Sequence, residues 1–551
     1  MSKEKLKVIP LGGCGEFGMN CTAIRWQDDI VVIDAGLMFP ESELLGVDIV
    51  VPDITYLVEN KEHVRGIFLT HGHEDHIGGL PWILSELKVP VYGSEFTLAY
   101  VEGKLEEHRL LDEIDLIELV PKHKITIGPF TIEPIHVTHS LVDCLSLAID
   151  TPVGVIVFTG DFKIDLSPPD GKSFDLLTFA EYGKRGVLAL FQDSTNVDRP
   201  GYTPSEHAVR PRLDEIFSQT RKKLFFSCFS SSIYRIGLAM ELAKKHGRKV
   251  AILGRSMMES CEIAQDLGYL NLPQGLVIQP GQMRDYDADE LMILISGTQG
   301  EPMSALSRAA VDNHKHAKID AGDTVLLSSR VIPGNEKGIF RVIDHLSRRD
   351  ANVIFDDGSS GLIHVSGHGS QEEQRLLINL LRPKFFIPIH GDYRHLKKHT
   401  EVALSTGAIE HTLIMEDGDV VELTQTTILK RDKVTAGRIC IDSGSTIDVV
   451  EDVVIRDRRI LSEDGIIIAI ITINKRTGKM ERAPEVVMRG FAANDIVEDA
   501  QQVILKTLDS SNDEEKADYG VIKEKIRVDL KRYIQKSTSR RPMIMPVILE
   551  I

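Results

Sequence analysis

The sequence predicts an α/β protein built from several domains, and three observations support this fold class. The chain has 551 residues, of which 42% are hydrophobic and 26% are charged, as in ordinary globular domains. Short β-branched runs that end in a polar residue and a turn recur along the chain, which is typical of buried strands. Between about residues 206 and 361 such runs alternate with helical patterns, which indicates a parallel sheet. At roughly 100–200 residues per domain, the length suggests about three domains.

A histidine or an aspartate stands at the carboxyl end of six predicted strands. These strands lie within residues 29–36, 66–73, 133–140, 154–161, 187–194 and 382–392, and their terminal polar residues are Asp34, His71, His139, Asp161, Asp193 and His390. Strand ends are rigid mounts for functional side chains in layered α/β scaffolds. One such ending would be weak evidence, but the repetition predicts a single shared site.

The order of the segments predicts that one domain is inserted into another. The α/β block at 206–361 separates two stretches that carry parts of the shared site, namely 1–205 and 362–425. Residues 426–450 have the composition of a linker, and residues 451–551 are expected to form a small α+β unit. We therefore expect a discontinuous first domain, an inserted domain and a C-terminal domain.

The segment THGHEDHIGG, residues 70–79, has the spacing of a metal-binding loop. His71 and His73 can present two imidazoles to one centre, and Asp75 and His76 can then face a second centre. Zn²⁺ favours imidazole together with carboxylate, and two metals ~3.5–4 Å apart form a clamp used in phosphodiester hydrolysis. The glycine pair 78–79 is expected to permit a tight turn and a close approach of the backbone.

The remaining ligands must come from distant segments. Asp161 is expected to bridge the two metals, His139 to complete the first centre and His390 to complete the second. Asp34 is expected to orient a ligand imidazole from outside. Taken singly, each of these residues is more often a capping or core residue, so the prediction depends on their occurring together.

Composition indicates the cellular compartment of the protein and the partners that suit its charge. The formal net charge of −18 argues against non-specific coating of nucleic acid, although bound metals and local basic clusters can still favour a polyanionic substrate. Six cysteines without a CxxC pair indicate free thiols in a reducing cytoplasm. No apolar run approaches the ~18 residues of a membrane span, and the first residues lack the apolar region of a signal peptide. We expect a cytoplasmic protein that does not associate with membranes.

Several motifs carry a family resemblance. Residues 70–79, THS at 138–140, TGD at 159–161 and DAG at 34–36 resemble the metallo-β-lactamase superfamily of αββα hydrolases. FQDST at 191–195, HVSGHGSQEE at 364–373 and IHGDYR at 389–394 are similar to motifs of its β-CASP nucleases. Within that group, LGGCGEFGMN at 11–20, GTQGEPMSALSR at 297–308, RDRRILSEDG at 456–465 and RRPMIMPVILEI at 540–551 resemble bacterial ribonuclease J.

The resemblance implies a metallo-β-lactamase fold with an inserted parallel α/β β-CASP domain and a small C-terminal α+β domain. It implies 5′-to-3′ exonuclease and endonuclease activity in RNA maturation and mRNA decay, on single-stranded RNA with a 5′-monophosphate. It also implies two Zn²⁺ per chain, with an additional Mn²⁺ or Mg²⁺ left open, and a homodimer or homotetramer. RNA-decay or ribosome-associated proteins are the expected further partners. Met19 and the segment SSRVIPGNE, residues 328–336, depart from the family pattern.

The expected mechanism uses a water molecule that the metals acidify and that Asp75 and Asp161 hold in line with phosphorus. The departing 3′-oxygen needs a proton, and His368, poised by Asp193, is the candidate general acid. A purely structural hydrogen bond of His368 in its glycine-rich turn is the alternative.

Recognition of a 5′ end needs donors for a terminal phosphate. Ser231 and Ser232 stand between a predicted strand and a helix, and His364 and Ser366 stand beside the candidate acid. The two serines at 231 and 232 would serve equally as a simple helix cap. Basic stretches at 221–223, 394–399 and 475–476 could contact the RNA backbone, or form solvated surface.

Three other functions are weighed against the nuclease. A hydrolase of small thioesters or lactams would need the metal motif but neither the inserted domain nor residues 364–370. A flavin-linked di-iron oxidoreductase typically has Glu in place of His73, and no flavodoxin-like segment follows. A catalytically silent subunit of an RNA-decay complex would not need the complete set of ligands.

Overall fold

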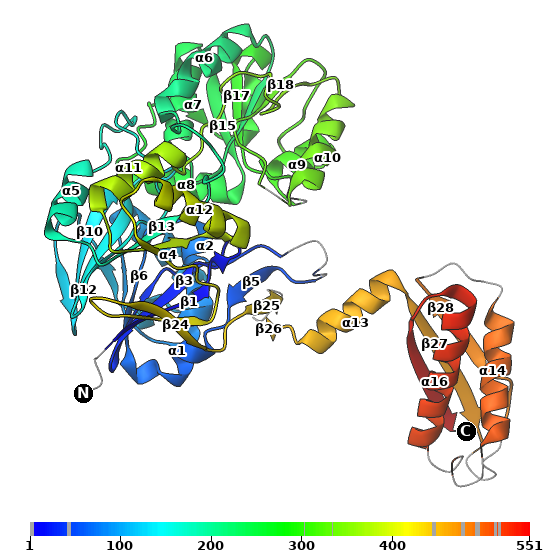
Figure 1. Cartoon of the computed structure of the whole chain (residues 1–551). Helices are drawn as coiled ribbons and strands as arrows, with labels where there is room; N and C mark the ends of the chain where they lie inside the picture. The colour runs from blue at the N-terminus through cyan, green and yellow to red at the C-terminus, as the bar shows by residue number, and fades with distance from the viewer. Residues whose placement is uncertain are drawn as a thin grey trace. The chain divides into compact units, whose positions relative to one another are not determined.

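The computed structural model describes all residues except 1–4, 41–43, 45, 302, 333, 443–447, 475–479, 491–495, 512–514, 516–518 and 551. The chain forms two compact units, which are described separately. One consists of Met1–Met38 and Val51–Arg438, and the other of Phe39–Val50 and Ile439–Ile551. Figure 1 shows the elements of both units.

Two large sheets form the centre of the first unit. The eight-stranded sheet has the order β24 (Ile428–Lys433), β23 (Asp419–Leu423), β1 (Leu6–Gly12), β3 (Cys21–Trp26), β4 (Asp29–Ile33), β6 (Val64–Phe68), β7 (Val91–Gly93) and β8 (Leu116–Glu118). The seven-stranded sheet has the order β22 (His411–Thr412), β20 (Phe385–Ile389), β13 (Ala189–Asp193), β12 (Gly154–Phe158), β11 (Cys144–Thr151), β10 (Phe130–Val137) and β9 (Ile125–Ile127). Side chains of both sheets, such as Phe68 and Phe158, share one buried cluster, so the sheets pack face to face.

Helices cover the outer faces of this sandwich. Helices α1 (Thr55–Glu59), α3 (Leu80–Glu86) and α4 (Glu95–Glu107) contribute to a cluster with the outer face of the first sheet. Helices α5 (Leu176–Arg185) and α11 (Gln371–Leu381) pack against each other and contribute to the cluster on the outer face of the second sheet, and α12 (Tyr393–Ser405) follows β20. These layers make the predicted αββα arrangement, which Figure 1 shows.

Parallel pairing explains why the polar strand ends meet. Strands β12, β13 and β20 are parallel neighbours, so Asp161, Asp193 and His390 emerge at one edge of the second sheet. In the first sheet β4 and β6 are also parallel, and they deliver Asp34 and His71. A short pair, β2 (Cys14–Gly15) with β21 (Gly391–Asp392), ties the β1–β3 connection to the segment after His390.

A third sheet lies within residues 206–361. It is wholly parallel, with the order β16 (Val277–Ile278), β15 (Lys249–Leu253), β17 (Leu291–Ile295), β14 (Leu224–Ser227), β18 (Thr324–Leu327) and β19 (Asn352–Ile354). Its helices are α6 (Arg210–Gln219), α7 (Ile233–Lys245), α8 (Arg255–Asp266), α9 (Ala305–Ala310) and α10 (Glu336–Ser347). One face shares a buried cluster with the second sheet of the sandwich, which makes the two parts one continuous core.

The second unit has a small α+β core. Strand β27 (Ile466–Ile473) lies between β28 (Glu485–Arg489) and β29 (Met543–Glu550), and is antiparallel to the first and parallel to the second. Helices α14 (Val497–Ser510) and α16 (Tyr519–Thr538) pack on this sheet through Ile504, Ile526 and Leu530. Helix α13 (Asp452–Glu463) and strands β25 (Arg438–Asp442) and β26 (Asp448–Val449) precede it, and β5 (Ile49–Pro52) lies where the chain returns to the first unit.

The segment predicted as a linker, 426–450, contains regular structure. Residues 428–433 form β24, which pairs with β23, so the first sheet continues past the boundary predicted at residue 425. Most side chains of β24 are exposed, and an edge strand of this kind lacks the apolar periodicity by which strands are predicted.

All six cysteines are buried free thiols, as their spacing predicts. Within the described residues, no helix is both long enough and apolar enough to cross a membrane.

Candidate metal centre

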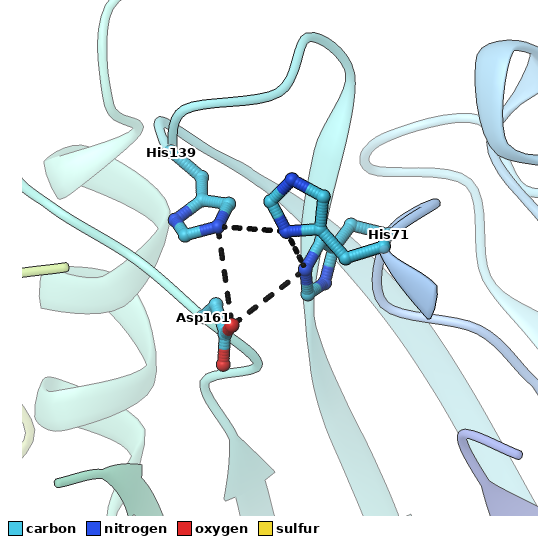
Figure 2. Close-up of side chains that lie close together, drawn as sticks. His71, His139 and Asp161 are labelled. Carbon is cyan, nitrogen blue, oxygen red and sulfur yellow. Dashed lines mark hydrogen bonds and ion pairs between the residues drawn. The ribbon is translucent and has the colours of Figure 1, made fainter. Parts of the chain in front are cut away.

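The first group of ligand candidates joins three imidazoles and one carboxylate. His73 Nδ1 lies 3.0 Å from His71 Nε2 and 3.2 Å from His139 Nε2. Asp161 Oδ2 lies 3.6 Å from His71 Nε2 and 3.9 Å from His139 Nε2. Figure 2 shows His71 and His139 directed toward Asp161. All four residues offer a ligand atom to one small region, which we call the first centre.

The second centre shares Asp161 with the first and contains two imidazoles and two carboxylates. His76 Nε2 lies 3.4 Å from Asp161 Oδ2 and 3.7 Å from Asp75 Oδ2. His390 Nδ1 lies 2.6 Å from Asp161 Oδ1, and its Nε2 lies 3.4 Å from Asp75 Oδ2. The structure therefore brings all seven predicted ligands together, with Asp161 common to the two groups.

Buried partners hold the outer nitrogens of the imidazoles. Asp34 Oδ2 accepts from His76 Nδ1 at 2.8 Å, and the Thr70 hydroxyl donates to Asp34 and lies 3.1 Å from His71 Nδ1. The Gly367 carbonyl accepts from His139 Nδ1 at 2.7 Å. In the neutral form of each imidazole, a proton on Nδ1 satisfies these acceptors and leaves Nε2 to face its centre as a lone pair. Asp34 thus occupies the position from which a carboxylate orients His76.

The two centres differ in their effect on histidine. In the first centre, burial is the main cause that lowers the pKa of His71 and His139, and it lowers the pKa of His73 to about 4. In the second centre, burial acts in the same direction, but the carboxylates outweigh it: Asp161 and Asp34 raise the pKa of His76, and Asp161 and Asp75 raise that of His390 to about 10.

The donor set fits metal binding. In the first centre, the lone pairs of His71 Nε2 and His139 Nε2 both face His73 Nδ1 at hydrogen-bond distance, and neutral imidazoles can share at most one proton there. A cation between the three nitrogens would turn this repulsion into coordination. In the second centre, both carboxylates have pKa values lowered by their histidine neighbours against the effect of burial, so they are anionic ligands.

His368 lies beside both centres, with its ring centroid 4.9 Å from that of His139 and 5.9 Å from that of His390, and it belongs to neither imidazole group. Its Nδ1 is 2.8 Å from Asp193 Oδ2 and 3.9 Å from Asp161 Oδ2. Burial lowers the pKa of His368, but Asp193 and Asp161 outweigh it and raise the pKa above its usual value. His368 therefore holds a proton more readily than a free histidine does.

Asn196 shapes the turn that carries His368, and sequence reasoning did not single it out. Its Nδ2 donates to Ser366 Oγ at 2.9 Å and to the His368 carbonyl at 2.8 Å. The His368 backbone N–H also donates to Ser366 Oγ, at 3.2 Å. The position of Asn196 three residues after Asp193 was the available signal.

The four residues predicted to bind a terminal phosphate lie on two neighbouring segments. Ser232 is the N-cap residue of α7 but makes no capping hydrogen bond with its side chain, and Ser231 Oγ lies 3.1 Å from His73 Nε2. Burial, and then the charge of Arg235, lower the pKa of His364 to about 3. Among the described residues, no hydrogen bond joins Ser231 or Ser232 to His364 or Ser366.

A buried ion-pair network connects these segments to the metal loop. Glu206 Oε1 accepts from Lys163 Nζ at 2.9 Å, and its Oε2 accepts from Arg235 Nη2 at 2.8 Å. Arg235 Nη1 also donates to Ser328 Oγ and to the Ile363 carbonyl. Lys163, two residues after Asp161, is thereby tied to α7, to the end of β18 and to the segment before His364. Sequence reasoning missed this network because its members are far apart in the chain.

Several of the predicted basic contacts are neutralised within the protein. Lys223 pairs with Asp320 and Asp323, Arg394 with Asp198 and Lys398 with Glu401. His399 is buried against Ser194. Residues 475–476 lie outside the described residues.

The glycine pair after the histidine loop forms the predicted turn. Gly78 and Gly79 connect α2 (Glu74–Ile77) to α3, with φ values of −67° and −83° that other residues can also adopt. Space is what requires glycine there, because an added Cβ would lie 2.4 Å from Leu37 at Gly78 and 2.5 Å from the Gly36 carbonyl at Gly79. The expected turn and the expected close approach are both present, and the close approach is the reason for the two glycines.

Family models match most of the chain. The metallo-β-lactamase superfamily model matches residues 14–199, and the ribonuclease J β-CASP domain model matches 221–346. The model for the RNA specificity domain of Zn-dependent metallo-hydrolases matches 362–414, and the ribonuclease J C-terminal domain model matches 453–551.

Two relatives are similar to the chain over nearly their whole length. Ribonuclease J2 of Bacillus subtilis (strain 168) is 39% identical over 553 residues, which cover 100% of this chain and 99% of that protein. Ribonuclease J of Thermus thermophilus is 40% identical over 558 residues, covering 100% and 96%. A solved structure of a protein of unknown function from Enterococcus faecalis V583 has a TM-score of 0.53 at 16% identity, over 76% of this chain and 100% of that one, and supports the fold alone.

Full-length similarity and four consecutive domain matches agree with the two-centre geometry and the inserted parallel sheet. The chain belongs to the ribonuclease J family of metallo-β-lactamase-fold, β-CASP-containing proteins.

Proposed function

We propose that the protein is a zinc-dependent ribonuclease that degrades single-stranded RNA from its 5′ end, prefers a 5′-monophosphate and also cleaves internally. The observation that carries this proposal is the pair of ligand groups that share Asp161, with the His368–Asp193 pair beside them. The matches to the β-CASP and RNA specificity models favour this function over a small-molecule hydrolase or a flavin-linked oxidoreductase.

Two Zn²⁺ ions suit the donor set. His71, His73 and His139 would hold the first and His76, Asp75 and His390 the second, with Asp161 between them. When bound, the two ions supply positive charge that neutralises phosphate oxygens and acidifies a water molecule. An additional Mn²⁺ or Mg²⁺ is part of the proposal only if the zinc-loaded protein needs it for hydrolysis of RNA.

The protein's own residues position the reaction and move its protons. The carboxylates of Asp75 and Asp161 accept hydrogen bonds from the attacking water and orient it toward phosphorus. Asp193 holds His368 at Nδ1, which leaves Nε2–H to pass its proton to the departing 3′-oxygen. The raised pKa of His368 supports this role, because a general acid must hold its proton at neutral pH.

The 5′-phosphate pocket is proposed from Ser231, Ser232, His364 and Ser366. Ser366 Oγ accepts hydrogen bonds from Asn196 and from the His368 N–H, so its own proton is free to donate to a phosphate oxygen. Ser231 Oγ can likewise accept from His73 Nε2 and donate elsewhere. Neutral donors satisfy a monophosphate, while a triphosphate would crowd them.

The cellular setting is proposed from the family and the charge pattern. We place the protein in the cytoplasm, in RNA maturation and mRNA decay, as a homodimer or homotetramer with RNA-decay or ribosome-associated partners. The match of residues 453–551 to the ribonuclease J C-terminal domain supports a separate module for assembly.

The decisive experiment compares one RNA with a 5′-monophosphate, a 5′-triphosphate or a blocked 5′ end, using the zinc-loaded protein. We expect mononucleotides from the monophosphate form, slower release from the triphosphate form and internal cuts alone in the blocked form. No cleavage of any RNA would instead support a catalytically silent subunit of a decay complex.

A double variant tests the pocket. Replacing Ser232 and Ser366 with alanine removes hydrogen bonds to a charged group, each worth ~1.5–3 kcal/mol, so release of mononucleotides should fall at least ~10-fold. Internal cleavage of the blocked RNA should survive as the matched control. Equal loss of both activities would show that these serines support the fold or the catalytic centre.

A further inference from the structure

Two arginines near the turn that carries His368 have no side-chain partner in the part of the chain that the structure describes. Arg199 lies in the loop after β13, and Arg330 lies in the loop after β18. Both side chains are exposed, and neither guanidinium makes a hydrogen bond, ion pair or ring contact with a described residue. Their backbones are nevertheless held: the Arg199 carbonyl accepts from Gln371 N at 2.9 Å, and the Arg330 carbonyl accepts from Gln299 Nε2 at 2.9 Å.

Both loops are anchored on the segment that contains His364, Ser366 and His368. Three residues before Arg199, Asn196 holds Ser366 Oγ and the His368 carbonyl. Two residues before Arg330, Ser328 Oγ donates to the Ile363 carbonyl at 2.7 Å. The two arginines therefore flank one short segment from opposite loops, one belonging to the sandwich and the other to the inserted domain.

The charges of this pair act on each other. Burial and then the charge of Arg199 lower the pKa of Arg330, and Asp356 opposes them without forming an ion pair. Arg330 also contributes to the lowered pKa of His364, which is consequently neutral. Two cations held near each other without a bridging carboxylate favour an anion between them.

Other basic residues give the contrast. Arg235, Arg394 and Lys223 each pair with a carboxylate of the protein, at 2.8, 2.7 and 2.8 Å. Internal pairing leaves such residues little capacity for a polyanion. In a chain of net charge −18, two guanidiniums without an ion pair among the described residues offer positive charge to a substrate phosphate beside the turn that carries His368.

We propose that Arg199 and Arg330 together bind a phosphate group of the RNA substrate as it passes the 363–368 segment. The ligand is a phosphate oxyanion, from either the 5′ terminus or an internal phosphodiester. This inference rests on the proposed ribonuclease function and adds two substrate-binding residues to it. Guanidinium groups can donate two parallel hydrogen bonds to such an oxyanion, which a point charge cannot.

The test uses the variants Arg199→Gln and Arg330→Gln and a fluorescent single-stranded RNA. Equilibrium binding is measured with each substitution added to His368→Gln. Steady-state hydrolysis is measured with each substitution alone. Loss of one charged partner should raise Kd and KM about 10-fold and leave kcat unchanged. The slope of log Kd against log salt should become shallower by ~0.7 for one lost phosphate contact. Arg330→Lys should recover part of the affinity because it keeps the charge.

Arg284→Gln is the matched control. Arg284 is exposed and follows β16, at the edge of the six-stranded sheet farthest from β18 and β19. It should change neither Kd nor the salt slope. A 5′-hydroxyl RNA separates the two phosphate sources: a retained effect identifies an internal phosphate, and a lost effect identifies the terminal one.

The inference is overturned if Kd and the salt slope are unchanged in both variants. It is also overturned if Kd changes equally in Arg284→Gln, or if kcat falls while Kd and KM stay the same. The proposed function fails separately, if the unaltered protein hydrolyses no RNA. In that case the binding measurements still decide whether the two arginines contact RNA.

Discussion

The two centres use the same kinds of ligand, yet their surroundings give the histidines opposite properties. The first has three imidazoles and only the shared Asp161, and burial lowers the pKa of His71 and His139. The second has two imidazoles beside Asp161 and Asp75, with Asp34 behind His76. There the carboxylates outweigh burial and raise the pKa of both histidines. Burial lowers the pKa of all five histidines, so the nearby carboxylates account for the difference between the two centres.

The opposite shifts in histidine pKa imply that the two centres are two different kinds of metal-binding site. The first centre is already deprotonated at neutral pH in the metal-free protein. The second must exchange protons for metal, and it carries more negative charge with which to attract the ion.

The largest expected effect comes from Asp161→Ala, which removes the one residue that both centres share. We expect the affinity for both metal ions to fall together and the rate of hydrolysis to fall ~10³-fold or more. The reason is that loss of the shared carboxylate removes several kcal/mol of charge stabilisation. Metal analysis and RNA turnover measure the two effects. Loss of one equivalent alone would show that Asp161 belongs to a single centre.

The comparison becomes sharper with a matched pair, His139→Ala and His76→Ala. Each removes one imidazole, from the first and the second centre respectively, so each should leave about one zinc equivalent per chain and abolish hydrolysis while leaving the fold intact. Circular dichroism controls for folding. Full activity in His76→Ala, or an active metal-free protein, would contradict the assignment of the ligands.

A smaller effect is expected at His368, which belongs to neither imidazole group. His368→Ala should slow hydrolysis ~10²–10⁴-fold and leave both zinc equivalents bound, because its proposed task is protonation. If zinc is lost from this variant, His368 is itself a ligand, together with Asp161 or Asp193.

The smallest effect is a difference in proton release. The raised pKa values mean that His76 and His390 carry an extra proton at neutral pH, and for His390 the pKa is about 10. Each of the two must lose that proton to bind a metal ion. The second centre should therefore release protons on binding at pH 7–8 and weaken as the pH falls, while the first should do neither. Calorimetric titration in buffers of different ionisation enthalpy measures this, and equal release at both centres would contradict the comparison.

Local sequence patterns were sufficient to predict much of this protein. The strands that carry Asp34, His71, His139, Asp161, Asp193 and His390 are short apolar runs followed by a polar residue and a turn, and the structure brings these residues to one region. This succeeds because burial of alternate or consecutive side chains is encoded within a few residues, and because parallel strands place their carboxyl ends at a common edge.

Other features depend on segments that meet only in the folded chain. The spacing of residues 70–79 cannot reveal that Gly78 makes room for Leu37, and the polar edge strand β24 has no apolar period. The Lys163–Glu206–Arg235 network and the opposite pKa shifts of the two centres arise from long-range contacts.

The sequence by itself determined the layered α/β class, the inserted domain and the identity of the metal-ligand candidates, because these follow from periodicity and spacing along the chain. Only the tertiary structure decided which nitrogen of each histidine faces its centre, which carboxylate is shared, and which arginines remain without a partner. The physical reason is distance: charge and hydrogen-bond effects act over a few ångströms in space, and residues hundreds of positions apart, such as His139 and Gly367, come within that range only through packing.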